Sequence, residues 1–386
     1  MEAYLDNAAT TRVSDGVRDV MERTMSVDFG NPSSLHRKGV EAERYIRAAA
    51  EQAARSLKAQ PKEIVFTSGG TESNNLALIG AALAMRRRGK HLIATQFEHA
   101  SVNSPLLFLE EMGFTVDFAP VDELGHVLLP ELCRLVRPDT VLVSVMYVNN
   151  ELGAVQDIAA LSAAVRAKNP GILFHADAIQ AYGKYRICPK KEGIDLLSVS
   201  GHKIHGPKGS GFLYIRDGVR IRPILWGGGQ QRGMRSGTEN VPAIAGLGRA
   251  IEEIYTEHER KVSELYGLKK RLLERLSALP GVTVNAVTEP LSGCAPHIVS
   301  ASFEGVRSEV LLHALEERGV YVSSGSACSS NHPGISGSLR AIGVREELLD
   351  STLRFSFSKD TQEEEIDYAA AQLSELLPVL RRYTRR

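Results

Sequence analysis

The sequence predicts an α/β protein in which a large domain with a mostly parallel seven-stranded sheet is joined to a smaller α+β domain. Two observations carry this prediction. In the first part of the chain, short apolar or β-branched segments alternate with amphipathic stretches, as in βαβ units. Further on, strands and helices follow one another without strict alternation. The chain has 386 residues, of which 43% are hydrophobic, so each domain can bury a core.

The seven predicted strands of the large domain are short and strongly apolar, as expected of parallel strands that are covered on both faces. Segments between them, such as 72–89 and 130–139, read as covering helices that end near Gly or Pro. We place the large domain at residues 14–245. The strands are EIVFT (63–67), HLIAT (91–95), FTVDFA (114–119), TVLVSVM (140–146), ILFHAD (172–177), IDLLSVS (194–200) and GFLYIR (211–216).

The smaller domain comprises residues 1–13 and 246–386. A long charged helical stretch, about 244–278, leads into it. After this stretch the pattern predicts two strands, HIVSASFE (297–304) and STLRFSF (351–357), and two helices, EVLLHALEERG (309–319) and EEEIDYAAAQLSELLPVLRRY (363–383).

Composition narrows the possible functions. Lys plus Arg (46) equals Asp plus Glu (46), which argues against a nucleic-acid or membrane partner recruited by net charge. No stretch approaches the ~20 apolar residues of a membrane-spanning helix, and MEAYLDNAATTRV does not resemble a signal peptide, so we expect a cytoplasmic protein. The four cysteines lie far apart without a CxxC pair, which predicts neither a disulfide framework nor a metal site.

The segment SGGTESNN (68–75) follows the first predicted strand and opens a helix. Gly70 lets the backbone approach an anion closely, and free N–H groups at a helix N-terminus favour a phosphate, with Thr71 beside it. An ordinary helix cap made by Ser68 or Thr71 is the alternative, and the motif alone leaves both open.

Further polar residues follow other strands, and ligands of such sheets bind beyond the carboxyl ends of the strands. A lone acid is usually a turn residue and a lone lysine is usually solvated. Together, however, a phosphate cradle, an acid and a lysine are what a pyridoxal phosphate (PLP) site requires. His99 could shuttle protons there or be an ordinary loop histidine. The residues at these strand ends are Asn150, Asp177, Gln180, Ser200, His202 and Lys203.

Three other segments contain candidate functional residues. The glycine-rich stretch 227–240 contains Thr238 and two arginines, and is either a flexible loop or an anion contact. Cys328 lies among serines and glycines in 323–338, where an exposed thiol is a candidate nucleophile. Arg354 is a lone charge in a predicted strand, which suits a clamp for a substrate carboxylate or a structural salt bridge.

The chain resembles the cysteine desulfurases, the NifS/IscS-like branch of the class V aminotransferase-like PLP enzymes of fold type I. The resemblance spans nearly the whole chain. It rests on YLDNAATT (4–11), FGNPSSLH (29–36), TSGGTESNN (67–75), EHASV (98–102), VNNELGAVQDI (148–158), HADAIQ (175–180), SGHKIHGPKG (200–209), RGMRSGTENV (232–241), SSGSACSS (323–330) and LRFSF (353–357).

The resemblance implies a role for each of these residues. Lys203 would be the Schiff-base lysine, Asp177 the partner of the pyridinium nitrogen, and His99 the residue stacked on the ring. The other implied contacts are Asn150 and Gln180 with the ring substituents; Gly70, Thr71, Ser200 and His202 with the phosphate; Thr238 with the phosphate from the neighbouring subunit of a homodimer; Arg354 with Asn31 on the cysteine carboxylate; and Cys328 as nucleophile.

The resemblance also implies the reaction. L-cysteine would give L-alanine and a persulfide on Cys328, whose sulfur passes to an acceptor protein for iron-sulfur cluster assembly or tRNA thiolation. A selenocysteine lyase or another class V aminotransferase would share the lysine and aspartate, and Cys328 in its SGSAC segment discriminates against the aminotransferase. We expect PLP as cofactor.

Overall fold

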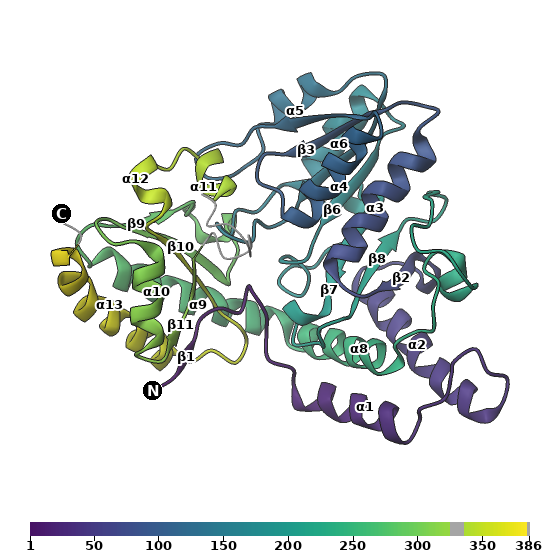
Figure 1. Cartoon of the computed structure of the whole chain (residues 1–386), viewed down its shortest axis with the longest axis horizontal. Helices are drawn as coiled ribbons and strands as arrows, with labels where there is room; N and C mark the ends of the chain where they lie inside the picture. Colours follow the sequence, from purple (N-terminus) through teal and green to yellow (C-terminus); the bar gives the residue numbers. More distant parts are fainter. Residues whose placement is uncertain (325–335, 384–386) are drawn as a thin grey trace.

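A computed structural model of the chain describes residues 1–324 and 336–383 and arranges them in two units with separate sheets (Figure 1). The predicted seven-stranded, mostly parallel sheet is confirmed, in the order β2-β8-β7-β6-β5-β3-β4. Only β8 runs antiparallel to its neighbours in this sheet. The strands are β2 (Ile64–Thr67), β3 (His91–Thr95), β4 (Thr115–Ala119), β5 (Thr140–Met146), β6 (Leu173–Asp177), β7 (Leu196–Ser200) and β8 (Gly211–Ile215).

Burial along these strands explains why they read as apolar runs. Every residue of the interior strand β5 is buried, as expected of a parallel strand that is covered on both faces. Strand β4 lies at the edge of the sheet and only Ala119 in it is buried. The helices of this unit are α1 (Asp15–Ser26), α2 (Arg37–Ser56), α3 (Gly70–Met85), α4 (Ala100–Glu111), α5 (Leu129–Leu135), α6 (Ile158–Lys168), α7 (Pro189–Glu192) and α8 (Val241–Tyr255).

The long helical stretch predicted over about 244–278 is two helices, α8 and α9 (His258–Ser277). Glu257 between them has φ 51°, a left-handed conformation that a continuous α-helix excludes. Helix α8 packs closely on α2, where a Cβ at Gly248 would lie 2.9 Å from Cα of Ala49. Its apolar residues join the core of the large sheet. The predicted domain boundary at residue 245 stays a prediction, and this packing favours a division near Glu257.

The smaller unit has an antiparallel sheet in the order β12-β13-β10-β9 and a two-stranded parallel pair, β1 with β11. Its core contains Phe303 and Phe355, whose rings lie 6.3 Å apart. The elements are β1 (Ala3–Tyr4), β9 (Val282–Asn285), β10 (Ile298–Phe303), β11 (Val320–Tyr321), β12 (Ser323–Ser324), β13 (Thr352–Ser356), α10 (Ser308–Glu316), α11 (Gly337–Ala341), α12 (Glu346–Leu349) and α13 (Glu363–Tyr383).

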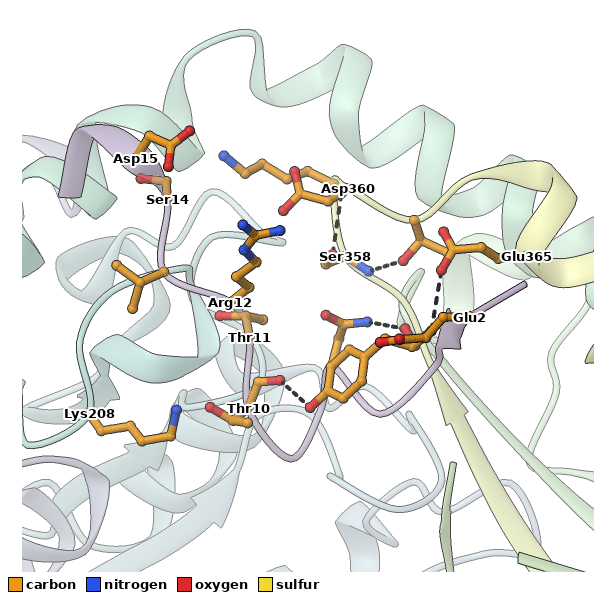
Figure 2. Close-up of a pocket in the computed structure, with 15 residues that line it drawn as sticks. Glu2, Thr10, Thr11, Arg12, Ser14, Asp15, Lys208, Ser358, Asp360 and Glu365 are labelled. Atoms are coloured by element: carbon orange, nitrogen blue, oxygen red, sulfur yellow. Dashed lines mark hydrogen bonds between the residues drawn. The ribbon is translucent and has the colours of Figure 1, made fainter. Parts of the chain in front are cut away.

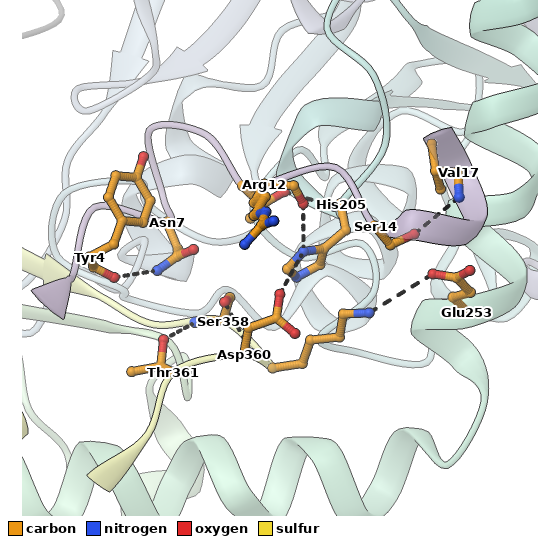
Figure 3. Close-up of polar contacts among 12 residues, drawn as sticks. Tyr4, Asn7, Arg12, Ser14, Val17, His205, Glu253, Ser358, Asp360 and Thr361 are labelled. Carbon is orange, nitrogen blue, oxygen red and sulfur yellow. Dashed lines mark hydrogen bonds and ion pairs between the residues drawn. The ribbon is translucent and has the colours of Figure 1, made fainter. Parts of the chain in front are cut away.

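The segment after β1 crosses from the smaller unit to the larger one and is held by both. The backbone N–H of Thr11 donates to the carbonyl of His202 (2.9 Å). The buried His205 lies with Nδ1 2.9 Å from the carbonyl of Arg12 and 3.5 Å from a carboxylate oxygen of Asp360 (Figure 3). One side of this segment lines a polar cleft of about 730 Å³ between the units (Figure 2). Its other side reaches the cavity described below.

No helix within residues 1–324 and 336–383 has both the length and the apolar character that crossing a membrane requires. The same ranges contain no group of three or more His, Cys, Asp or Glu side chains arranged to hold a metal ion.

Candidate active site

A cavity of about 260 Å³ lies where β5, β6 and β7 end, against the N-terminal segment and β13. Strands of one parallel sheet end at the same edge, so side chains that are far apart in sequence meet there. The predicted residues that line this cavity are Gly70, Thr71, His99, Asn150, Asp177, Gln180, Ser200, His202, Lys203 and Arg354.

The N-terminus of α3 opens into the cavity. The N-cap residue of α3 is Gly69, which has no side chain to cap the first turn. Neither Ser68 nor Thr71 occupies the cap position. The capping alternative is therefore wrong for both. A Cβ at Gly70 would lie 2.2 Å from the end of the Ile179 side chain, so a larger residue would displace that side chain. With Thr71 and Ser200 nearby, the uncapped helix end suits a phosphate group.

Asp177 ends β6 with only 2% of its surface exposed. One carboxylate oxygen accepts from the Asn74 side chain (2.8 Å) and the other from the backbone N–H of Ile179 (3.0 Å). Burial raises the pKa of Asp177, and the nearby His99 and Lys203 act in the opposite direction. A carboxylate in such a place is stabilised by a cation, so the site fits a cofactor that carries a protonated ring nitrogen.

Lys203 follows β7 in a single 3-10 turn, Gly201–Lys203. Its Nζ donates to the carbonyls of Ala8 (2.6 Å) and Ala9 (2.5 Å) in the N-terminal segment. Beside it, burial and then the charges of Lys203 and Lys208 lower the pKa of His202 to about 4. His202 is therefore neutral near pH 7, and its Nδ1 lies 3.2 Å from the Thr10 hydroxyl.

His99 caps α4 and lines the cavity. Its Nδ1 accepts from the backbone N–H of Ser101 (3.1 Å) and lies 2.8 Å from the Ser101 hydroxyl. Burial lowers the pKa of His99, while Asp177 raises it and Lys203 lowers it further. As the N-cap of α4, His99 is held with its ring at the cavity.

Arg354 is the residue of the smaller unit that lines the cavity, and it is 5% exposed. It donates from Nη1 to the carbonyl of Asn150 (2.9 Å) and from Nη2 to the carboxylate of Asp6 (2.8 Å). The structural ion pair considered from the sequence is thus present. The buried Nε has no hydrogen-bond partner among the described residues, so the guanidinium retains a donor for an anion.

Two predicted residues among the described ones are not brought to this cavity. Asn31 and Thr238 are exposed and do not line it, and the Asn31 side chain accepts from the backbone N–H of Ser33 instead (2.9 Å). Cys328 lies outside the described residues. The described chain continues at Ser336, which caps α11.

Sequence reasoning missed Glu98, Asn74 and Ser101. Glu98 is buried, and its carboxylate accepts from the Thr95 hydroxyl (2.6 Å) and the backbone N–H of Met146 (2.8 Å), so it joins the ends of β3 and β5. Burial raises its pKa to about 8. Asn74 lies one helical turn after Thr71, and that spacing was a usable signal because both face the sheet edge.

Comparison with known proteins places this geometry in context. A sequence model of the family described as aminotransferase class-V matches residues 3–369. A curated relative named cysteine desulfurase IscS, from Methanosarcina thermophila, is 43% identical over 98% of this chain and 92% of its own length. A protein of the same name from Escherichia coli O139:H28 is 46% identical over 95% of this chain and 90% of its own.

Solved structures agree in fold. A structure titled NifS-like protein is 39% identical, with a TM-score of 0.93, and the match covers 98% of this chain and all of that one. The apo structure of a cysteine desulfurase from Thermococcus onnurineus is 26% identical, with a TM-score of 0.88, over 98% of this chain and 95% of that one.

Proposed function

The chain belongs to the class V aminotransferase family and, within it, to the cysteine desulfurases, and from this membership we propose that it is a PLP-dependent cysteine desulfurase that converts L-cysteine to L-alanine. The sulfur passes to Cys328 and then to an acceptor protein. The cytoplasmic location expected from the sequence stays a prediction.

One observation carries the proposal. A buried carboxylate, a lysine and an uncapped helix N-terminus line one cavity together with a buried arginine. This set matches the four anchors that PLP and an amino-acid substrate need: a partner for the ring nitrogen, an amine for the aldehyde, a phosphate cradle and a carboxylate clamp. The residues in these roles are Asp177, Lys203, Thr71 with Gly70, and Arg354.

When bound, PLP supplies an electron sink that acidifies the Cα–H bond of the substrate. The residues around it hold it in place. Asp177 would keep the ring nitrogen protonated, and Lys203 would supply the amine that holds the aldehyde carbon. Ser200 and His202 would bind the phosphate beside Thr71. Asn150 and Gln180 would contact the ring substituents.

The substrate is held and deprotonated by two residues. Arg354 binds its carboxylate through the guanidinium, whose Nε has no partner among the described residues. Lys203, once freed, takes the Cα proton, since its Nζ already lies at the cavity beside the carbonyls of Ala8 and Ala9. Displacing these hydrogen bonds is part of the motion that brings the amine to the substrate.

Sulfur transfer then uses Cys328. Its thiolate forms a bond to the substrate sulfur while the substrate Cβ–S bond breaks, and the electron pair stays on the substrate carbon, which is protonated to give alanine. The persulfide remains on Cys328 for the acceptor. Before Cys328 in the chain, strand β12 pairs with β13 at Arg354. After it, Ser336 at the start of α11 donates a hydrogen bond to Glu151.

We further propose a homodimer. Asn31 and Thr238 lie outside the cavity of their own chain, and a second copy would bring such residues to the site. Asn31 lies between the exposed apolar side chains of Phe29 (66% exposed) and Leu35 (99%) in the sequence. A second copy that contacted this segment would cover them. Sedimentation of the purified protein should give twice the mass of the 42.1 kDa chain.

The decisive experiment is sulfide release from L-cysteine with PLP and a thiol reductant present, comparing the wild type with Cys328→Ala and, as a matched control, Cys133→Ala. We expect the wild type and the control to release sulfide and alanine in equal amounts and Cys328→Ala to release neither. Equal activity of Cys328→Ala would remove the persulfide step and favour an aminotransferase or selenocysteine lyase.

A further inference from the structure

A bridge of two side chains, Asn74 and Ser101, connects Asp177 to His99 behind the cavity. The Asn74 amide nitrogen lies 2.8 Å from a carboxylate oxygen of Asp177 and 2.9 Å from the Ser101 hydroxyl. The Ser101 hydroxyl lies 2.8 Å from Nδ1 of His99. Asn74 is fully buried, and Ser101 is buried at the wall of the cavity.

The hydrogen positions in this bridge follow from the groups that cannot change. The carboxylate of Asp177 accepts, so the group of Asn74 that faces it must be the NH₂, because the flipped amide would set two oxygens against each other. The second N–H of the same NH₂ then points at the Ser101 oxygen. That oxygen accepts from Asn74, which leaves its own hydrogen available to Nδ1 of His99, 2.8 Å away.

A second donor acts on the same nitrogen. The backbone N–H of Ser101 points at Nδ1 of His99 at 3.1 Å, and a backbone N–H can only donate. Nδ1 therefore carries a lone pair and the ring proton is on Nε2, which has no hydrogen-bond partner among the described residues. A proton on Nδ1 would face the backbone donor and displace the hydroxyl hydrogen.

We propose that Ser101, oriented by Asn74, fixes His99 as a neutral imidazole with its proton on Nε2, so that the ring presents a hydrogen-bond donor to the cavity. Ser101 and Asn74 are positioning residues. The inference deepens the proposed function and rests on it, since that proposal places His99 at the reacting groups. It assigns the movement of the Cα proton to Lys203, because a neutral ring of this tautomer has no free lone pair.

The charged groups around the ring are consistent with this assignment. Asp177 and Lys203 both act on His99, with opposite signs, and burial disfavours the imidazolium. The position of His99 at the N-terminus of α4 adds the positive end of a helix dipole, which also favours the neutral ring.

The direct test is ¹⁵N NMR of protein labelled in the histidine rings, recorded for the apo protein and the PLP-loaded protein from pH 6 to pH 9. The His99 signals are identified by their loss in His99→Gln. We expect an unprotonated Nδ1 and a protonated Nε2 throughout this range. A protonated Nδ1 in the wild type would overturn the proposal.

Variants test the bridge itself. Ser101→Ala removes one donor to Nδ1, so the pKa of His99 should rise and kcat for sulfide release should fall roughly fivefold, with KM little changed. Ser101→Thr keeps the hydroxyl and should restore both. Asn74→Ala should act in the same direction as Ser101→Ala. The control is Asn75→Ala, because among the described residues the Asn75 side chain bonds only to the carbonyl of Thr71 (2.9 Å) on its own helix.

The outcomes separate this inference from the proposed function. If the wild type releases no sulfide but the His99 ring keeps its proton on Nε2 across the pH range, the desulfurase proposal fails and the tautomer assignment stands. If sulfide is released and the protonation of the two His99 nitrogens at each pH is the same in Ser101→Ala as in the wild type, the bridge does not control His99 and the inference is wrong.

Discussion

The carboxyl edge of the large sheet and strand β13 of the smaller unit face each other across one cavity, but they contribute to it unequally. The sheet edge and the turns and helices that follow it supply nine of the predicted residues, and β13 supplies Arg354 alone. On the sheet side, Asp177 is held by Asn74 and a backbone N–H. On the other side, Arg354 is held by Asp6 and one carbonyl.

This difference follows from how the two sides are built. Parallel strands that end together bring backbone groups and side chains to one place, so most of the cofactor side is assembled within a single chain, with Thr238 as the contact left to a second copy. The substrate side is completed by an ion pair that a substrate carboxylate must share. We therefore expect changes on the sheet side to abolish chemistry and changes at Arg354 to weaken substrate binding.

The largest effect is expected for Lys203→Ala. Without the Nζ amine the aldehyde of PLP has no covalent anchor and the Cα proton has no acceptor, so kcat should fall by at least about a thousandfold. Sulfide release and the visible absorbance of bound PLP measure the two losses. Lys208→Ala, an exposed lysine of the same loop, is the control and should keep both.

Asp177→Asn should follow, with a loss of at least about a hundredfold in kcat, because the ring nitrogen loses its anionic partner. The same variant should change the stability of the apo protein little, since a neutral amide avoids the burial penalty that raises the pKa of Asp177 but replaces one of its two acceptor oxygens with a donor. Urea unfolding of the apo protein measures this. A large loss of stability would show that the carboxylate has a structural role.

Arg354→Lys tests the other side. One amine cannot contact Asp6, the Asn150 carbonyl and a substrate carboxylate as a guanidinium can. KM for L-cysteine should rise roughly ten- to a hundredfold, which corresponds to about 1.5 to 3 kcal/mol for hydrogen bonds to a charged group. Asp6→Asn should lower KM for L-cysteine, because it weakens the ion pair that holds Nη2 of Arg354. If both variants change kcat alone, Arg354 does not bind the substrate carboxylate.

The smallest effect concerns Glu98, whose pKa burial raises to about 8 in the folded protein, against about 4.3 in an unfolded chain. Between these values the unfolded chain releases a proton that the folded protein keeps. The free energy of unfolding should therefore fall as pH rises through this window, by up to about 1.4 kcal/mol per pH unit, and level off above pH 8.

Glu98→Gln should remove this dependence, while the exposed Glu111→Gln keeps it. Urea unfolding of the apo protein at several pH values from 5 to 8 measures the slope. An unchanged slope in Glu98→Gln would mean that other groups account for it. The comparison with Asp177→Asn then shows how much stability the buried carboxyl groups at the sheet edge cost together.

Much of the architecture was predictable, because strong local patterns produced it. The seven strands of the sheet and the helices 309–319 and 363–383 were predicted close to their observed bounds, since apolar runs and helical periodicity are properties of short segments. The break at Glu257 was not predicted, because the charged residues around it keep a helical pattern and only the packing of α8 on α2 sets the change of direction. The strands β1 and β11 were not predicted, because two residues are too few to show an alternating pattern.

By itself, the sequence determined the fold class, the strand ends at which the site forms, and most residues of the site, since the motifs place Lys203, Asp177 and Thr71 after predicted strands. The tertiary structure alone decided which side chains meet. It set Asp6 against Arg354, joined Asp177 to His99 through Asn74 and Ser101, and left Asn31 and Thr238 outside the cavity of their own chain. These contacts join residues from separate elements, and their distances depend on how the elements pack rather than on any local pattern.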